Sequence, residues 1–201
     1  PTKIIAIGLN YAAHAAEGGR LPPEEPIVFM KAPTAIIGPD EPIVLPSIDR
    51  RTDHEAELVV VIGKKCRGVS RDKALENVFG YTCGNDVSDR PIQKRDGQWV
   101  RAKSFDTFCP LGPWIETELD TSNIAVKAVV NGEIKQHSDT SKLIFNVPFL
   151  IEFVSNVMTL LPGDIIMTGT PDGVSPLKPG DVVEIVIEGI GALRNPVVYN
   201  G

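Results

Sequence analysis

The sequence predicts a β-rich α+β fold, in which many short strands and a few short helices form one domain. Glycine (18 residues) and proline (17 residues) together exceed their average share of roughly 12%, which indicates a body rich in turns. The strand-like runs are short, and they do not alternate with helices as they do in a parallel α/β protein. We therefore expect about ten strands and three helices in a single domain over residues 1–201.

The first 25 residues are expected to form a strand, a helix and a loop. Residues 4–8 (I-I-A-I-G) are typical of a short buried strand, and Asn10 is a suitable N-cap for a helix over residues 11–17. Gly18 and Gly19 would end this helix, and a proline-rich loop follows. Short apolar pieces between prolines come next, at 27–30, 35–37 and 43–45.

The strongest strand prediction covers residues 55–62 (E-A-E-L-V-V-V-I), a compact run rich in valine. Ser70 is expected to cap a helix that continues to Phe79, and residues 81–86 are expected to form another strand. Residues 88–97 contain several charges and a proline, so they are predicted to be a loop.

The C-terminal half contains the clearest hairpin signal. Two runs, 124–130 and 133–137, are joined by Asn-Gly, the pair that a type I′ turn prefers. Residues 148–157 are predicted to be a helix because apolar residues recur at helical spacing, at positions 150, 153, 154 and 157. Pro-Gly-Asp turns precede two further predicted strands, at 165–168 and 182–188.

Charge and hydropathy exclude several classes of partner. The net charge is −6, and no basic stripe is visible, so neither nucleic acid nor an anionic membrane surface is expected to bind. The apolar runs are far shorter than the roughly 18 residues that a membrane-spanning helix needs. Three cysteines without metal-type spacing are expected to be reduced and buried, which fits a cytoplasmic protein.

Two glutamates open the predicted strand at 55–62. Glu55 and Glu57 are two residues apart, so both carboxylates project from one face of the strand. Like charges beside a buried run are costly unless a cation lies between them, and Mg²⁺, Mn²⁺ and Ca²⁺ all favour carboxylate oxygens. Asp86 offers a third carboxylate, with Asp89 as an alternative. On an exposed edge, however, the same glutamates would only be solvated, and Asp86 would only form an Asx turn.

Three other places carry residues of catalytic type. His14 and Glu17 are three residues apart on the predicted helix, so they can pair either as a general base or as ordinary surface residues. Lys103 lies among apolar and aromatic neighbours, where it would neutralise an anionic substrate or be a surface lysine. Residues 168–174 (T-G-T-P-D-G-V) form a turn that either binds a carboxylate or carbonyl or has no further role.

Five motifs follow one another in a fixed order: G-L-N-Y-A-A-H-A-A-E at 8–17, H-E-A-E at 54–57, N-D at 85–86, A-K-S-F at 102–105 and T-G-T-P at 168–171. In this order they resemble the fumarylacetoacetate hydrolase family, with the closest likeness to its short acylpyruvate hydrolase and oxaloacetate decarboxylase-like members. A stretch near residue 25, E-P-I-V-F-M-K, also matches. The resemblance implies a mixed β-sandwich roll of the C-terminal domain type, one catalytic domain over residues 1–201 with a lid in residues 1–25, and a homodimer.

The resemblance also implies roles for particular residues. The acidic metal triad would be Glu55, Glu57 and Asp86, holding one Mg²⁺, with Mn²⁺ or Ca²⁺ as alternatives. The catalytic residues would be His14 and Glu17, which activate water, and Lys103, which faces the substrate. The remaining substrate contacts would be Arg90, Gln93 and Thr170.

The implied reaction is the metal-dependent hydrolysis of a carbon–carbon bond in a 2,4-dioxo acid of the acylpyruvate or fumarylacetoacetate type, through a metal-stabilised pyruvate enolate. The same site suits two alternatives, which are decarboxylation or tautomerisation of oxaloacetate and isomerisation or decarboxylation of 2-hydroxyhepta-2,4-diene-1,7-dioate. A third alternative is a metal-stabilised binding module without activity. The intact His14, Glu17 and Lys103 argue against the binding module, because stability alone does not require them.

Overall fold

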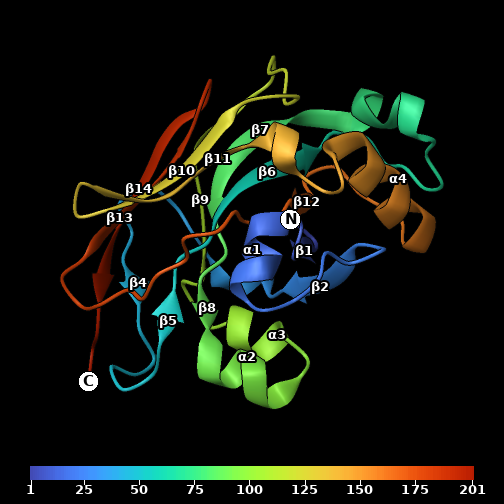
Figure 1. Ribbon diagram of the computed structural model, residues 1–201. Helices are drawn as coiled ribbons and strands as arrows, with labels where there is room; N and C mark the ends of the chain where they lie inside the picture. Colours follow the sequence, from blue (N-terminus) through green and yellow to red (C-terminus); the bar gives the residue numbers. More distant parts are fainter.

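A computed structural model describes all residues, 1–201, and confirms the β-rich α+β fold (Figure 1). Two mixed sheets carry most of the strands. In spatial order, the seven-stranded sheet contains β2 (Ile27–Lys31), β1 (Ile4–Gly8), β12 (Ile165–Met167), β6 (Ala56–Ile62), β7 (Val78–Asn85), β9 (Cys109–Glu116) and β3 (Ile36–Ile37). The five-stranded sheet contains β11 (Glu133–Asp139), β10 (Ala125–Val130), β13 (Val182–Ile187), β14 (Gly191–Val198) and β4 (Ile43–Val44). A small third sheet pairs β5 (Thr52–Asp53) with β8 (Ser88–Asp89).

The seven-stranded sheet is curled into a roll. Its two edge strands, β2 and β3, are joined only by residues 32–35, which include the 3₁₀ helix η1 (Pro33–Ala35). Five Cα steps span at most about 18 Å, whereas the edges of a flat sheet of this width would be about 29 Å apart. The sheet must therefore bend until its edges approach each other, and this gives it an inner and an outer face.

Strand β6 is buried along its whole length because both of its faces are covered. Leu58, Val60 and Ile62 belong to the larger hydrophobic core, which also contains residues of the five-stranded sheet. Val59 and Val61 belong to a second, smaller core that includes residues of β1, β9 and β12. Because side chains alternate along a strand, Glu57 shares the inner face of the roll with Val59 and Val61.

The helices are short and lie around the sheets (Figure 1). They are α1 (Ala12–Glu17), α2 (Arg90–Asp96), α3 (Val100–Lys103) and α4 (Val147–Val157), with the 3₁₀ helices η2 (Arg71–Asn77) and η3 (Thr140–Lys142). None of them has the length and apolar character that crossing a membrane requires. The three cysteines are free and buried, as expected.

The loop predicted at 88–97 is wrong, because this segment forms β8 and α2. The Asp89 carboxylate accepts a hydrogen bond from the Ile92 N–H at 3.1 Å and so caps α2. Pro91 fits the first helical turn, where no backbone donor is needed, and Gly97 ends the helix with a φ of 69°. The charges between these signals lie on a helix rather than a loop.

One predicted helix cap is wrong, and a second lacks the expected hydrogen bond. Tyr11 occupies the N-cap position of α1, and the Asn10 amide instead donates to the backbone carbonyls of Phe145 and Thr168. Ser70 occupies the N-cap position of η2 as expected, but its side chain makes no capping hydrogen bond, and the helix ends before Phe79, which belongs to β7. The Asn10 cap fails because tertiary contacts engage its amide.

The inward face of α4 differs from the predicted one at its C-terminal end. Leu150 and Val154 are buried as expected, but Val157 is 60% exposed. The buried stripe instead includes Val147 and Ile151. Two long strands, β9 and β14, were not anticipated because both contain proline.

Candidate active site

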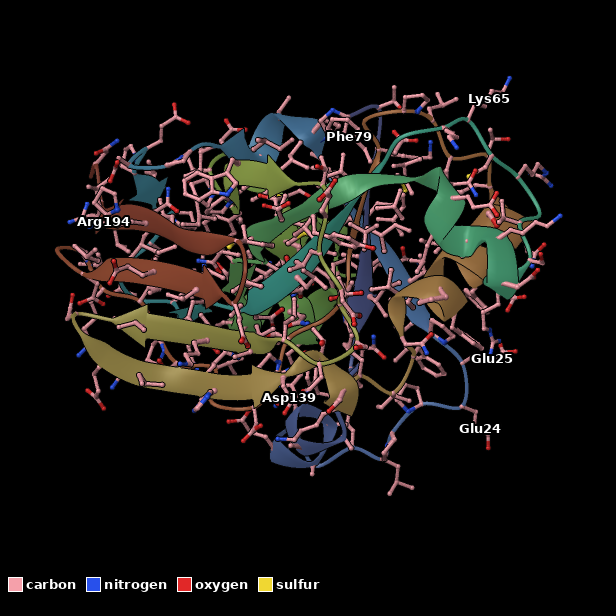
Figure 2. The ribbon with its side chains drawn as sticks, turned by 90° about the horizontal axis from the view of Figure 1, so that it is seen from above. Glu24, Glu25, Lys65, Phe79, Asp139 and Arg194 are labelled. Atoms are coloured by element: carbon pink, nitrogen blue, oxygen red, sulfur yellow. The ribbon has the colours of Figure 1, made fainter.

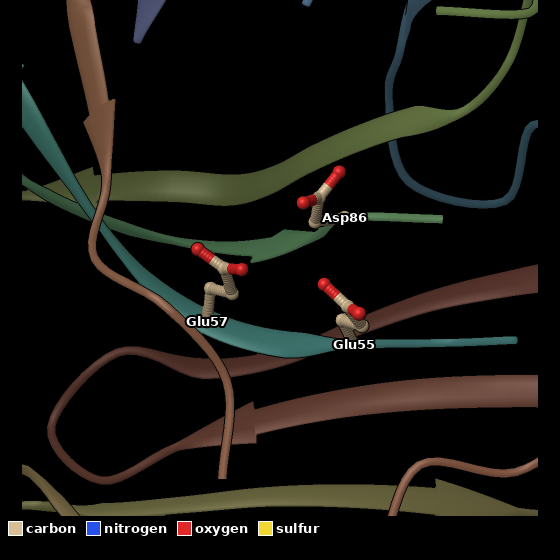
Figure 3. Close-up of side chains that lie close together, drawn as sticks. All are labelled: Glu55, Glu57 and Asp86. Carbon is tan, nitrogen blue, oxygen red and sulfur yellow. The ribbon is translucent and has the colours of Figure 1, made fainter. Parts of the chain in front are cut away.

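Strands β6 and β7 bring three carboxylates together. Their antiparallel register pairs Ala56 with Asn85, so Glu55 lies opposite Asp86, and the Asp86 N–H donates to the Glu55 carbonyl at 2.9 Å. One carboxylate oxygen from each of Glu55, Glu57 and Asp86 lies within 4.8 Å of the others, and all three residues are buried. Figure 3 shows the three side chains pointing into one space. The exposed-edge interpretation of these glutamates is therefore excluded.

Three cations contact two of these carboxylates. Lys103 Nζ lies 2.7 Å from Glu55 Oε2 and 2.6 Å from Asp86 Oδ2. Lys31 Nζ lies 2.5 Å from Asp86 Oδ1, and Arg90 Nη2 lies 2.7 Å from Glu55 Oε1. Burial alone would raise the pKa of Glu55, but Lys103 and Arg90 outweigh it and hold this pKa well below its ordinary value. Glu55 is therefore ionised.

Lys103 is a buried lysine, not a surface one, because it is only 2% exposed. Burial by itself would lower the pKa of its ammonium group, but Asp86 and Glu55 raise it above its usual value. Its charged form is thus held by the same carboxylates that it neutralises.

Glu57 differs from its two neighbours because no lysine, arginine or histidine forms an ion pair with it. Its Oε2 accepts one hydrogen bond, from the Gly169 N–H at 2.8 Å. Burial, followed by the charges of Asp86 and Glu55, raises the pKa of Glu57 well above its ordinary value. A buried carboxylate beside two others and without its own cation fits a divalent ion, and a set of oxygen ligands alone fits a hard one.

Helix α1 places His14 at the same site. Its Nδ1 lies 3.3 Å from Glu17 Oε2, and Glu17 Oε1 accepts a hydrogen bond from the Gly173 N–H at 3.2 Å. Figure 2 labels Asp139, the last residue of β11, and a bridge between Tyr11 and Leu143 joins the start of α1 to the segment that follows this strand. The pairing of His14 with Glu17 is therefore part of a contact between α1 and the loop that follows β12.

One small cavity joins most of the predicted site residues. Its polar lining consists of His14, Glu55, Glu57, Gln93, Lys103 and Thr170. Its apolar wall includes Ile7, Phe29 and Trp99. A larger hollow lies elsewhere, beside η2 and the start of α4, but Asp120 is the only acidic residue in it. The smaller cavity is therefore the one that brings two of the three clustered carboxylates together with His14 and Lys103.

Arg90 lies behind this cavity. Its Nε donates to Asp53 Oδ2 at 2.7 Å and its Nη1 donates to Gln93 Oε1 at 2.9 Å, in addition to its ion pair with Glu55. Arg90 therefore holds Glu55 and Gln93 in place, and a direct substrate contact by Arg90 stays a prediction. Asp89, the alternative third carboxylate, caps α2 and pairs with Arg50.

Two buried residues near the site were not recognised in the sequence. Lys31 is 2% exposed at the end of β2, and its ammonium also donates to the Lys103 carbonyl. Gln136 is 1% exposed on β11 and contacts His54, Ala56, Thr170 and Pro171 through its amide. Only two features of the sequence pointed to these residues. Lys31 ends an apolar strand, and Gln136 occupies an inward position of its strand.

The curled sheet carries a buried cluster of two glutamates and one aspartate that fits a divalent metal ion. Residues 3–198 match the model of the fumarylacetoacetate (FAA) hydrolase C-terminal domain. The chain belongs to the fumarylacetoacetate hydrolase family, and it is an enzyme of that superfamily.

Two solved structures and one further relative that resemble this chain are named for different activities. A 5-carboxymethyl-2-hydroxymuconate delta-isomerase from Mycobacterium smegmatis is 55% identical, with a TM-score of 0.94 over 100% of this chain and 80% of that one. A maleylpyruvate hydrolase from Sphingobium sp. SYK-6, solved with manganese(II) and pyruvate, is 40% identical, with a TM-score of 0.88 over 100% of this chain and 72% of that one. The oxaloacetate tautomerase fahd2 of Xenopus laevis is 44% identical over 98% of this chain and 66% of the relative.

Proposed function

We propose that this protein is a divalent-metal-dependent hydrolase that cleaves the carbon–carbon bond between C3 and C4 of a 2,4-dioxo acid of the acylpyruvate type. One observation carries the proposal. His14, which pairs with Glu17 and so suits activation of water, lines the same cavity as Glu55, Glu57 and Lys103. An enzyme that only moved protons or released carbon dioxide would not need a base for water.

Glu55, Glu57 and Asp86 would hold the metal, for which we propose Mg²⁺. When bound, a divalent ion supplies Lewis acidity and a template for the adjacent carboxylate and carbonyl oxygens of a 2-oxo acid. The maleylpyruvate hydrolase supports this view, since its structure contains manganese(II) and pyruvate together.

His14 is the proposed general base. Its Nδ1 faces Glu17, which leaves Nε2 to take a proton from water as the water attacks the C4 carbonyl. The bond between C3 and C4 then breaks, and the products are a carboxylic acid and pyruvate. Lys103 places positive charge beside the pyruvate half, where negative charge develops, and Thr170 contacts its oxygens.

A second candidate is the tautomerisation or decarboxylation of oxaloacetate at the same site. The similarity to the oxaloacetate tautomerase supports it, and the similarity to the delta-isomerase supports proton transfer in an unsaturated diacid. Neither reaction requires water as a nucleophile. We also propose that residues 1–201 act as one catalytic domain and that the protein works as a homodimer.

The test compares acetylpyruvate with oxaloacetate, each with Mg²⁺, with Mn²⁺ and with EDTA. Metal-dependent release of acetate and pyruvate from acetylpyruvate would support the hydrolase. Turnover of oxaloacetate alone would replace the hydrolase by the second candidate. Activity that is unchanged by EDTA would contradict the metal centre.

A further inference from the structure

The loop after β12, residues 168–181, diverges from the start of β6 beside the proposed metal ligands. At one end, Thr168 donates to the Leu58 carbonyl through both its N–H and its hydroxyl. At the other end, Asp53 bridges to Pro176. Next to that bridge the His54 N–H still donates to the Ser175 carbonyl at 3.4 Å. From there to Leu58 the two backbones do not pair, so the Ala56 N–H and the Pro171 carbonyl need partners from elsewhere.

Gln136 supplies both partners from the other sheet. Its Oε1 accepts from the Ala56 N–H at 2.9 Å, and its Nε2 donates to the Pro171 carbonyl at 2.7 Å. A backbone N–H can only donate and a carbonyl can only accept, so these two contacts fix which end of the amide is oxygen and which is nitrogen. The amide cannot flip without losing both bonds.

The fixed amide determines whether the Thr170 hydroxyl donates or accepts a hydrogen bond on the side of Gln136. The second N–H of Gln136 Nε2 points at Thr170 Oγ1, 2.9 Å away, so this oxygen acts as the acceptor. The hydroxyl proton of Thr170 must therefore point away from Gln136. Thr170 lines the cavity, and its hydroxyl donates to no other protein group.

We propose that Gln136 is a positioning residue that makes Thr170 a hydrogen-bond donor toward an anionic oxygen of the substrate. The inference rests on the proposed function only in that the ligand is a 2-oxo acid. Gln136 does not line the cavity, so it acts on the ligand through Thr170.

Gln136→Glu tests this arrangement because the carboxylate has nearly the same shape but no N–H. The carboxylate would accept the Thr170 hydroxyl proton, and the donor would be lost from the cavity. We expect the Mn²⁺-dependent affinity for pyruvate, measured calorimetrically, to fall by about 10- to 100-fold, the range for a hydrogen bond to a charged group. Affinity for Mn²⁺ alone should remain close to that of the wild type.

A double-mutant cycle separates positioning from general damage. In a Thr170→Val background the hydroxyl is already absent, so Gln136→Glu should change pyruvate affinity by less than about twofold. Additive losses in the double variant, or wild-type affinity in Gln136→Glu, would overturn the inference. If Gln136→Glu does not fold, Gln136→Met removes the donors without adding charge and should show the same non-additivity.

Asn195→Asp is the matched control. Asn195 is also a buried amide of the five-stranded sheet, and its Nδ2 donates to the carbonyls of Gly38 and Glu41 at 2.8 and 2.9 Å. This variant should lose stability and keep its affinity for pyruvate. Because pyruvate binding needs no turnover, a protein that binds pyruvate but cleaves no dioxo acid would contradict the proposed function alone. A wild-type protein that does not bind pyruvate would overturn the inference as well.

Discussion

Glu17 holds two groups at once: its Oε1 accepts a hydrogen bond from the Gly173 N–H at 3.2 Å, while its Oε2 lies 3.3 Å from His14 Nδ1. The orientation of the imidazole therefore depends on the loop after β12 as well as on α1. Movement of either segment would change the position of the proposed base.

His14→Ala should separate the two candidate reactions. We expect kcat for acetylpyruvate cleavage to fall by about 10²- to 10⁴-fold, the usual contribution of a general base, with little change in oxaloacetate turnover. His137→Ala is the control, because His137 is an exposed histidine on β11. Coupled assays of pyruvate release measure both substrates. Equal losses on both would contradict the assigned role.

Gly173→Ala should cost more stability than Gly180→Ala. Both glycines have positive φ, 90° and 92°, but a Cβ at Gly173 would lie 2.1 Å from the Lys135 carbonyl oxygen, whereas nothing lies within 4 Å at Gly180. We expect about 1–2 kcal/mol for Gly180→Ala from backbone strain and a larger loss for Gly173→Ala. Urea denaturation gives both values. Equal losses would show that Lys135 moves aside without cost.

Metal binding should release a proton from Glu57. Burial, Asp86 and Glu55 raise the pKa of Glu57, so the metal-free protein retains a proton there at a pH at which an ordinary glutamate is ionised. Because proton and metal compete, affinity for Mn²⁺ should fall by up to about tenfold for each pH unit of acidification. Calorimetry in two buffers with different ionisation heats counts the protons. Identical apparent heats would rule out proton release.

The same carboxyl group should make the metal-free protein less stable as the pH rises. A folded-state pKa raised above the unfolded value of about 4.3 stabilises the folded state at low pH, and this contribution is lost as pH rises through the folded pKa. Glu57→Gln removes the titration, so its free energy of unfolding in EDTA should decline less as the pH rises above about 4.3, the ordinary glutamate pKa. Urea denaturation across that range checks the slopes, and parallel slopes would contradict the prediction.

Lys31→Met should destabilise the protein by about 3–5 kcal/mol, because it leaves the buried Asp86 carboxylate without one of its two cations. The control is Arg194→Met, which removes an exposed ion pair with Asp40 and should cost no more than about 1 kcal/mol. Denaturant unfolding of both variants gives the comparison. A loss for Lys31→Met as small as the control would show that water replaces the ammonium.

The acidic cluster could be predicted from the sequence because it depends on local geometry. Glu55 and Glu57 share one face through the two-residue period of a strand, and Asp86 follows the neighbouring strand. Lys31 and Gln136 reach the same region only through tertiary packing, from β2 and β11. No spacing in the chain signals such contacts.

Errors in the predicted elements have similar causes. Asp89, Pro91 and Gly97 are ordinary helix-boundary residues, but the charges between them are equally typical of a loop. Strands β9 and β14 contain prolines and still form because each has only a two-residue strand, β3 or β4, on its outer side, so most of that side needs no N–H donor.

The location of the three carboxylates has a consequence for how activities diversify. They lie on or directly beside a single antiparallel pair, β6 and β7, whereas His14, Gln93 and Thr170 come from α1, α2 and the loop after β12. Substitutions or insertions in these peripheral segments can alter which molecule reacts and leave the ligand-bearing pair untouched. An ancestral scaffold could in this way give rise to isomerases, tautomerases and hydrolases without rebuilding its centre.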